Sequence, residues 1–333
     1  MRVALATALI VTASADARAG AVADLPPSPA WVSIPIDELR ASFDTVWGVS
    51  DLHGRLDELE QLLLAAGLVT GGEGRAPRWV AKRQLLVVVG DCIDEGPDSV
   101  ALVLLLRDLQ REAAAEGSRV VVLLGNHEVD FLAAPWKASK ELLSSAEAAG
   151  LRLGHKRRGE RLAAGEFGDF LRTMPVAAFV GSWLFAHSGY VDAENVDGLR
   201  AYFSGLAASW SGGDRDRYGP LRAARSIVSY HRWWESKRLR SRMRDHLGAL
   251  GLSGLVFGHD QNAFGAPGTI AMEAGGWLTK LDTGLKARRS AGMLLRCDVG
   301  RVVHGTSLSM SDGGKPTCGA VTPDGAVHDL PVR

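Results

Sequence analysis

The sequence predicts an α/β sandwich, in which a mixed β-sheet core carries helices on its outer faces. Between residues 45 and 126, apolar runs bounded by turn residues alternate with segments of helical periodicity. Short motifs that contain Asp, His and Asn follow most of these apolar runs, usually at a glycine. The composition, with 46% hydrophobic and 23% charged residues, is that of an ordinary globular domain with a core of normal size.

The chain begins with a segment that resembles a secretory signal peptide. Arg2 precedes an apolar stretch over residues 3–13, and small residues up to Ala19 form a cleavage site. We therefore expect a signal peptide over residues 1–19 and a Pro-rich linker or N-terminal segment over 20–44. Export would place the protein in the periplasm or outside the cell, and a disordered leader on a cytoplasmic protein is the alternative. No other segment approaches the ~20 apolar residues that a membrane span requires.

The first half of the domain has the pattern of a parallel sheet. A short helix or edge strand is expected over 34–45. Apolar runs predict buried strands, and leucines at helical spacing predict helices that end near glycines; in chain order these are strand 45–50, helix 55–67, strand 84–91, helix 99–117 and strand 119–126. This βαβαβ order is typical of a parallel sheet.

The second half alternates between helical and strand-like segments. Residues 129–178 and 192–250 are rich in helix-forming and charged residues, and we expect them to be helical inserts on one rim of the sheet. Strand character returns in three places, at 176–189, at 254–260 and in short runs between 277 and 308. We treat residues 45–310 as one domain and residues 311–333 as a C-terminal tail.

Charge and cysteine content exclude some classes of function. Lys plus Arg equals Asp plus Glu at 38 each, so no net field favours nucleic acid or an anionic membrane surface. Cys297 and Cys318 could form a disulfide in an exported protein, and with Cys92 they could equally remain unpaired small hydrophobic residues. The spacing of the three cysteines does not match a zinc site.

Candidate metal ligands occur in "VSDLHGR", "VVGDCIDEGPDS", "LLGNHEVDF", "FAHSGY" and "VFGHDQ"; they are Asp51, His53, Asp91, Asn126, His187 and His259. All of these motifs except the fourth lie at the carboxyl ends of predicted strands, where ligands collect in α/β folds. Asp51 and His53 can reach one ion from neighbouring positions. Asp91 can give one carboxylate oxygen to each of two ions, and the other three residues can complete the second.

This ligand set suits two Mn, Fe or Zn ions better than an all-oxygen calcium site. Two ions about 3.5–4 Å apart neutralise a phosphoryl group and acidify a bridging water to hydroxide, the chemistry of phosphoester hydrolysis. His127 directly follows Asn126, would face the substrate, and could protonate the leaving oxygen. Asp94 could hydrogen-bond that imidazole and raise its pKa. A purely structural hydrogen bond between His127 and Asp94 is the alternative.

These motifs resemble the calcineurin-like metallophosphoesterase superfamily. "GDCIDEGPDS", "GNHEV" and "FAHSG" are most similar to its phosphoprotein phosphatase (PPP) branch, and above all to the bacterial Shewanella-like protein phosphatases. The resemblance covers about residues 45–290. It implies a metallophosphoesterase domain over 45–310 with the metal site at the strand ends. It also implies a dimetal hydrolase of phosphomonoesters with the ligands and the acid pair named above.

The sequence departs from this family at the substrate phosphate. Glu95 stands where the family has an Arg that grips the phosphate, and a carboxylate there would repel it. Arg222 and Arg225, in "YGPLRAARS", are candidate replacements, because the subgroup tends to place a phosphate-binding Arg shortly after Gly-Pro-Leu. The strict offset, however, falls on Ala224. Asp260 replaces the Thr that usually follows the late Gly-His.

The sequence therefore predicts a metal-dependent phosphatase of phosphoserine or phosphothreonine proteins. A small-molecule phosphoesterase or dinucleoside polyphosphate hydrolase is the alternative, because the inserts could grip small substrates without the missing Arg. A non-catalytic phosphate- or partner-binding module is a third reading, which the complete set of ligands and the acid pair disfavour. The other histidines lack ligand-like neighbours, and we expect them on the surface or in the core; they include His155, His231, His246 and His304.

Overall fold

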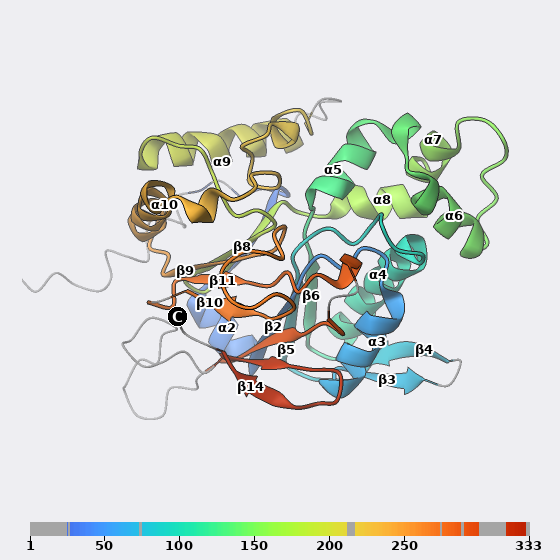
Figure 1. Ribbon diagram of the computed structural model, residues 1–333, viewed down its shortest axis with the longest axis horizontal. Coiled ribbons are helices and arrows are strands. Elements are labelled where there is room, and N and C mark those ends of the chain that lie inside the picture. Colours follow the sequence, from blue (N-terminus) through green and yellow to red (C-terminus); the bar gives the residue numbers. More distant parts are fainter. Residues whose placement is uncertain are drawn as a thin grey trace, which may run out of the picture.

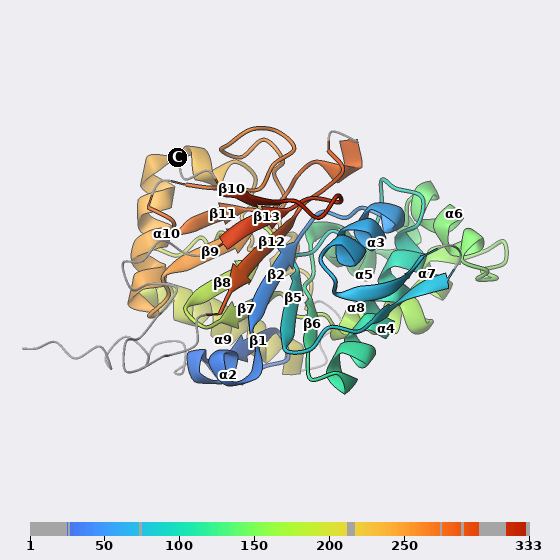
Figure 2. The same cartoon turned by 90° about the horizontal axis from the view of Figure 1, so that it is seen from below.

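The computed structural model describes residues 25, 27–72, 75–211, 217–273, 275–287, 290–299 and 318–330. In this part of the chain, two six-stranded sheets lie face to face and carry helices on their outer sides (Figures 1 and 2). The mixed α/β sandwich predicted from the sequence is therefore confirmed. The predicted signal peptide, residues 1–19, and the strand expected at 301–308 lie outside the described residues.

One sheet contains the predicted parallel strands. Its order is β14-β13-β12-β2-β5-β6, formed by β2 (Thr45–Val49), β5 (Gln84–Val88), β6 (Arg119–Val122), β12 (Leu294–Asp298), β13 (Cys318–Val321) and β14 (Val327–Asp329). β2, β5 and β6 are parallel, and β12 to β14 extend the sheet in antiparallel fashion. The crossover helices α3 (Leu56–Ala65) and α4 (Ser99–Ala115) cover its outer face (Figure 2).

The other sheet is mixed. Its order is β1-β7-β8-β9-β11-β10, formed by β1 (Trp31–Ile34), β7 (Ala177–Val180), β8 (Trp183–Ala186), β9 (Gly254–Phe257), β10 (Ala271–Met272) and β11 (Leu278–Lys280). The apolar run at 176–189 is not one strand, because the chain reverses at Gly181, which has φ 57°, and β7 pairs antiparallel with β8. A residue without Cβ adopts this left-handed conformation at little cost.

Strand alternation builds the core between the sheets. Val46, Leu85 and Val87 of the first sheet meet Phe185 and Val256 of the second in one buried cluster. The residues between them in sequence face the opposite way and pack under the helices. Both faces of these strands are therefore buried, which explains why they read as continuous apolar runs.

The predicted inserts are helical and lie on the same rim of the sandwich (Figure 1). The first contains α5 (Asn126–Ala133), η2 (Pro135–Lys137), α6 (Lys140–Ala148), α7 (Arg158–Ala163) and α8 (Glu166–Thr173). The second contains α9 (Val196–Ser211), η3 (Pro220–Arg222), η4 (Trp233–Glu235) and α10 (Lys237–Ala249). The two inserts lie over opposite sides of the sandwich (Figure 2).

Several smaller elements complete the description. The segment at 34–45 contains the helix α2 (Ile36–Ser42), and a two-stranded ribbon, β3 (Val69–Gly72) with β4 (Arg75–Trp79), was not predicted because its Gly- and Pro-rich sequence is typical of a loop. Cys297 and Cys318 form a disulfide between β12 and β13, while Cys92 is free and buried.

None of the helices in the described ranges is long and apolar enough to cross a membrane.

Candidate functional site

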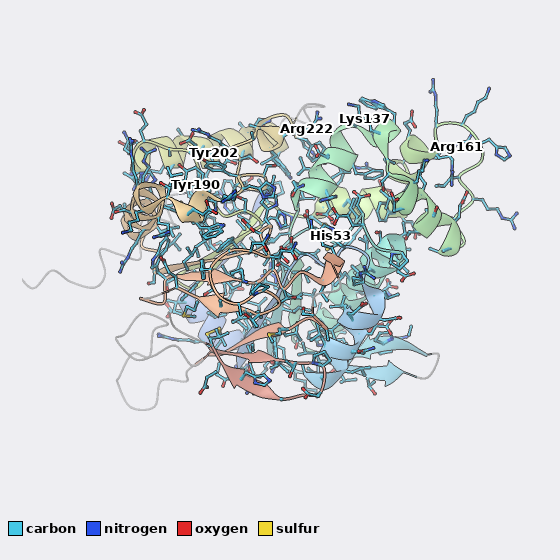
Figure 3. The ribbon with its side chains drawn as sticks, viewed as in Figure 1. His53, Lys137, Arg161, Tyr190, Tyr202 and Arg222 are labelled. Atoms are coloured by element: carbon cyan, nitrogen blue, oxygen red, sulfur yellow. A yellow bond between two sulfur atoms is a disulfide. The ribbon has the colours of Figure 1, made fainter. Side chains whose placement is uncertain are left out.

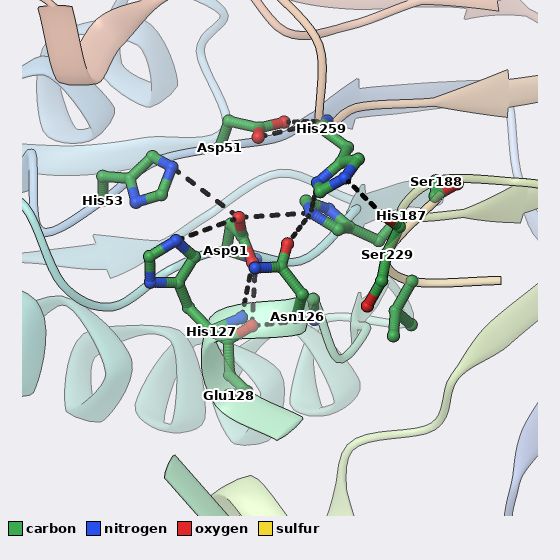
Figure 4. A network of polar contacts seen from close by, with 12 residues as sticks. Asp51, His53, Asp91, Asn126, His127, Glu128, His187, Ser188, Ser229 and His259 are labelled. Carbon is green, nitrogen blue, oxygen red and sulfur yellow. Dashed lines mark hydrogen bonds and ion pairs between the residues drawn. The ribbon is translucent and has the colours of Figure 1, made fainter. Parts of the chain in front are cut away.

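The predicted metal ligands meet where strands from both sheets end (Figure 4). Asp51 and His53 follow β2, Asp91 follows β5, Asn126 opens α5 just after β6, His187 follows β8 and His259 follows β9. The strands β2, β5 and β6 are parallel, as are β8 and β9, so each sheet delivers its ligands at one edge.

Asp91 is the centre of the site. Its Oδ2 lies 3.7 Å from His53 Nε2, 3.9 Å from His127 Nε2 and 3.2 Å from His187 Nε2, and Figure 4 shows the three imidazoles converging on it. Burial alone would raise the pKa of this carboxyl group, but the charge and hydrogen bond of His187, together with the other histidines, hold the pKa well below its usual range. Asp91 is therefore an anion that faces several ring nitrogens.

Backbone carbonyls fix the orientation of the ligand imidazoles. His53 Nδ1 donates to Ile93 O at 3.1 Å, and His187 Nδ1 donates to Val89 O at 2.8 Å. His259 Nε2 donates to the carbonyl of Ser229 at 3.2 Å. The second nitrogen of His53 and of His259 is thereby left as a lone-pair donor, the arrangement usual for metal-bound histidine. His187 Nε2 instead lies 3.2 Å from Asp91 Oδ2; burial lowers the pKa of His187, but the charges of Asp91 and Asp51 outweigh it and raise the pKa to about 10, so a metal ion would take the place of that proton.

The donor set fits two metal ions. His53 Nε2 is buried and has no hydrogen-bond partner among the described residues. Potential ligand atoms lie within 4.8 Å of one another in two groups that share Asp91, and the groups are His53, Asp91 and His127, and Asp91, His187 and His259. Asn126 joins the second group, because its Oδ1 lies 3.2 Å from His187 Nε2.

Asp51 lies in the site but outside both groups. Its two carboxylate oxygens accept the backbone N–H of His259 at 2.9 and 3.1 Å. Burial, together with the negative charge of Asp91, raises the pKa of Asp51 to about 6 despite the opposing charge of His187. A metal ion beside this carboxylate would favour its charged form.

His127 and Asp94, the predicted acid pair, lie within hydrogen-bond distance. His127 Nδ1 lies 3.0 Å from Asp94 Oδ2, and the other oxygen of Asp94 accepts the hydroxyl of Ser139 at 2.5 Å. Burial lowers the pKa of His127, but the hydrogen bond with Asp94 and the charges of Asp91 and Asp94 outweigh it and raise the pKa to about 9. The role of Ser139 was not predicted, since it lies far from Asp94 in sequence and outside the motifs.

The turns that carry the ligands are strained. Asp51, His53, Asp91, Asp94 and His259 all have positive φ values, between 42° and 67°. Residues with a Cβ pay a conformational cost there, and such strain tends to collect at functional sites. The surrounding structure therefore has to hold these turns in place.

Glu128 supplies much of this support. Its fully buried carboxylate accepts the backbone N–H groups of Asp91, Cys92, Ile93 and Gly125 at distances from 2.7 to 3.1 Å. It therefore holds the Asp91 turn against the start of α5.

The residues predicted to bind the substrate phosphate lie on the inserts. Arg222 Nε donates to Asp130 Oδ1 at 3.0 Å, one turn after His127 in α5, and Arg225 pairs with Asp192 at 3.5 Å. Both arginine side chains are exposed (Figure 3 labels Arg222). The structure thus places Arg222 near the rim on the α5 side.

Two residues near the site, Lys286 beside Glu95 and His231 beside His259, were not identified from the sequence. Glu95 Oε2 lies 3.3 Å from Lys286 Nζ, while Glu95 Oε1 lies 4.0 Å from His127 Nε2. His231, expected as an ordinary surface or core histidine, stacks on His259 with ring centroids 3.7 Å apart. Neither residue belongs to a motif, so no local spacing could have identified them.

Comparison with known proteins agrees with this geometry. A family model described as calcineurin-like phosphoesterase matches residues 45–264. Shewanella-like protein phosphatase 2 of Arabidopsis thaliana is 32% identical over 81 residues, which are 24% of this chain and 20% of that protein. A symmetrical bis(5'-nucleosyl)-tetraphosphatase of Janthinobacterium is 30% identical over 150 residues, 44% of this chain and 43% of that protein. The chain thus spans less than half of these relatives.

The fold has a solved counterpart in a cold-active protein-tyrosine phosphatase of a psychrophilic Shewanella. The two structures align with a TM-score of 0.67 at 17% sequence identity, and the alignment covers 93% of this chain and 84% of the Shewanella chain. The family model alone matches more than half of the chain, and the Shewanella-like relatives agree with the PPP resemblance. The chain therefore belongs to the calcineurin-like phosphoesterase family.

Proposed function

We propose that this protein hydrolyses phosphomonoesters and that phosphoserine or phosphothreonine in proteins is its substrate. The observation that carries the proposal is the His127–Asp94 pair, at 3.0 Å, whose free nitrogen faces the shared ligand Asp91 at 3.9 Å. A proton donor thus stands beside the centre that would hold the phosphoryl group. The similarity to Shewanella-like protein phosphatases supports a protein substrate.

Each side chain of the site has a definite part in this reaction. Asp51, His53 and Asp91 would hold one metal ion, and Asp91, Asn126, His187 and His259 would hold the other. When bound, such ions neutralise the charge of a phosphoryl group and acidify water. The carbonyl-bonded imidazoles keep one ring nitrogen directed inward, and Glu128 keeps the Asp91 turn in place.

His127 is assigned the role of general acid. At neutral pH an imidazole with a pKa of about 9 is protonated, so His127 Nε2 carries a proton for the leaving oxygen. Asp94 retains the proton on Nδ1 and stabilises the imidazolium, and it is itself fixed by Ser139. General acid catalysis of this kind contributes roughly 10²–10⁴ in rate.

The test is a comparison of initial rates on p-nitrophenyl phosphate, a phosphothreonine peptide and a dinucleoside tetraphosphate, with Mn²⁺ or with EDTA. Mn²⁺-dependent turnover of the peptide, lost in Asp91→Asn and His127→Ala, is the expected result. Metal binding without turnover of any of the three would contradict the proposal and favour a binding module.

Hydrolysis of a small phosphoester or dinucleoside polyphosphate by the same site is the second candidate. It is favoured by the similarity to the Janthinobacterium tetraphosphatase and by Glu95, whose carboxylate lies 4.0 Å from His127 Nε2. Turnover of the tetraphosphate alone in the same experiment would select this candidate.

We also propose that the protein works in an oxidising compartment, the periplasm or the outside of the cell. The disulfide between Cys297 and Cys318 supports this, because such bonds persist mainly where thiols are not kept reduced. Expression of the full chain, followed by fractionation and N-terminal sequencing, tests it. A mature N-terminus after Ala19 in the exported fraction is expected, and an uncleaved chain in the cytoplasm would contradict it.

A further inference from the structure

We propose that Lys286 is the cation that binds the phosphoryl group of the substrate, and that Glu95 occupies its binding position until substrate displaces it. This inference rests on the proposed phosphoester hydrolysis and assigns a residue to the task left open by the missing arginine. The carboxylate of Glu95 would then act as an internal competitor for the substrate anion.

The first support is that an anion already lies between the two expected donors. One oxygen of Glu95 lies 3.3 Å from Lys286 Nζ and the other lies 4.0 Å from His127 Nε2. His127 Nε2 in turn lies 3.9 Å from Asp91 Oδ2, at the centre of the metal ligands. A carboxylate and a phosphoryl group both present anionic oxygens, so a space that holds one between these cations is suited to the other.

The second support is that the backbone of Lys286 is fixed while its ammonium group is accessible. Lys286 belongs to η5 (Leu285–Ala287), and the neighbouring Leu285 is buried. The carbonyl of Lys286 accepts a hydrogen bond from Nη2 of Arg55 at 3.2 Å, and Arg55, the last residue of the first ligand motif, is itself buried. The side chain of Lys286 is 32% exposed and that of Glu95 is 42% exposed, so Glu95 is free to turn to solvent.

The third support comes from the charges around the site. Burial lowers the pKa of Lys286, but the charge and hydrogen bond of Glu95, with Asp51 and Asp282, outweigh it and raise the pKa. Lys286 is therefore a permanent cation at neutral pH. The exposed arginines Arg222 and Arg225 also pair with carboxylates, but their partners lie on the inserts, whereas Glu95, the partner of Lys286, lies beside His127.

Opposite effects of two substitutions test this assignment. Binding of inorganic phosphate to the Mn²⁺-loaded protein is measured by calorimetry for Lys286→Met and Glu95→Gln, with Lys82→Met as a control on an exposed lysine at the start of β5. The expected result is a Kd raised roughly tenfold or more in Lys286→Met, since a charge-assisted hydrogen bond is lost. A lower Kd is expected in Glu95→Gln and an unchanged Kd in Lys82→Met.

The conservative variant Lys286→Arg and the steady-state kinetics of Lys286→Met provide two further tests. Lys286→Arg should retain phosphate binding, and in Lys286→Met the KM for p-nitrophenyl phosphate should rise more than kcat falls. Wild-type phosphate affinity in Lys286→Met, or weaker binding in Glu95→Gln, would overturn the inference, as would the absence of phosphate binding by the wild type. If the wild type binds phosphate through Lys286 but hydrolyses no tested ester, the proposed function fails while the assignment of Lys286 stands.

Discussion

At the scale of single residues, the chemistry depends on where each imidazole keeps its proton. His53, His187 and His259 each donate one N–H to a backbone carbonyl, which directs the other nitrogen of each ring into the site. His127 differs, because its Nδ1 faces the carboxylate of Asp94 and its Nε2 faces the site. In the proposed mechanism, three of these histidines are therefore metal ligands and one is the proton donor.

Asp94→Asn should separate catalysis from metal binding. Asp94 counters the effect of burial on His127 and raises its pKa to about 9, so its removal lowers that pKa. Because His127 acts in its protonated form, the alkaline limb of the kcat profile should move to lower pH, and kcat should fall about tenfold or more. Metal content should stay at the wild-type level.

The measurement is a kcat–pH profile with Mn²⁺, beside Asp245→Asn on the exposed face of α10 as the matched control. An alkaline limb that stays at the wild-type pH would remove Asp94 from the acid role. Loss of metal together with activity would instead make Asp94 a structural residue.

Glu128→Gln should destabilise the protein and weaken metal binding. The carboxylate of Glu128 accepts four backbone N–H groups, whereas an amide has one oxygen acceptor and presents N–H to the remaining donors. Unsatisfied buried donors of this kind cost about 2–4 kcal/mol in the free energy of unfolding. Urea unfolding and Mn²⁺ titration measure both effects, and Glu141→Gln on the surface of α6 is the control. Wild-type stability would show that the turn holds without this carboxylate.

At the scale of elements, the site is made by sharp turns after strands. The chain leaves β2, β5 and β9 through residues with positive φ, which redirects the side chains toward the common edge. Such turns bring backbone and side chains so close that glycine is required beside them. An ideal Cβ on Gly258 would lie 2.2 Å from Asp51 Oδ2 and 2.6 Å from Ser50 Oγ.

Gly258→Ala should therefore displace Asp51 and release metal. Gly248→Ala is the matched control, because its Cβ would have no neighbour within 4 Å and it lies in the helix α10. The control should raise the free energy of unfolding by about 0.5–1 kcal/mol, since alanine loses less backbone entropy in a helix. Metal content after dialysis and thermal unfolding distinguish the two variants. Full metal retention in Gly258→Ala would show that the β9 turn relaxes without loss of the ligand.

The elements also show where sequence reasoning succeeds. The buried strands β2, β5 and β6 follow from unbroken apolar runs. The candidate ligands were selected because they come directly after such runs, and the structure brings them together. The ribbon β3–β4 was missed, because its Gly and Pro residues give no periodicity. Lys286 and Glu95 meet only because the folded chain brings together segments distant in sequence, and no local pattern encodes that pair.

At the scale of the whole molecule, the candidate metal ligands come from both sheets. Asp51, His53 and Asp91 come from the sheet that contains β2 and β5, whereas His187 and His259 come from the sheet that contains β8 and β9. Ions bound by both sets would link the halves of the sandwich at one edge. The same edge carries buried carboxylates, including Asp51 with its raised pKa, that would repel one another without a cation.

Metal removal should therefore lower global stability as well as activity. Ligand that binds only the folded state at 100 times its Kd stabilises it by about 2.7 kcal/mol. We expect a higher thermal midpoint with Mn²⁺ than with EDTA in the wild type, and no such difference in Asp91→Asn, which weakens both sites. Differential scanning calorimetry measures it. An equal shift in Asp91→Asn would mean that Mn²⁺ acts elsewhere on the protein.

The disulfide adds a second link, which should affect stability but not turnover. Cys297 and Cys318 join β12 to β13 across a separation of 21 residues, and β12 in turn pairs with β2. Removing a bond that closes a loop of this size costs about 3 kcal/mol in the free energy of unfolding. Urea unfolding should show that loss for the double substitution Cys297→Ser and Cys318→Ser.

Added thiol reductant should destabilise the wild type by a similar amount and leave the double variant unchanged. The kcat of the double variant should equal that of the wild type, because none of the assigned ligands or acid residues lies on β12 or β13. Equal stability with and without the bond would indicate that the β13–β14 hairpin is held by strand pairing alone. In that case the disulfide would no longer argue for an oxidising compartment, and the assignment to one would depend on the N-terminal segment.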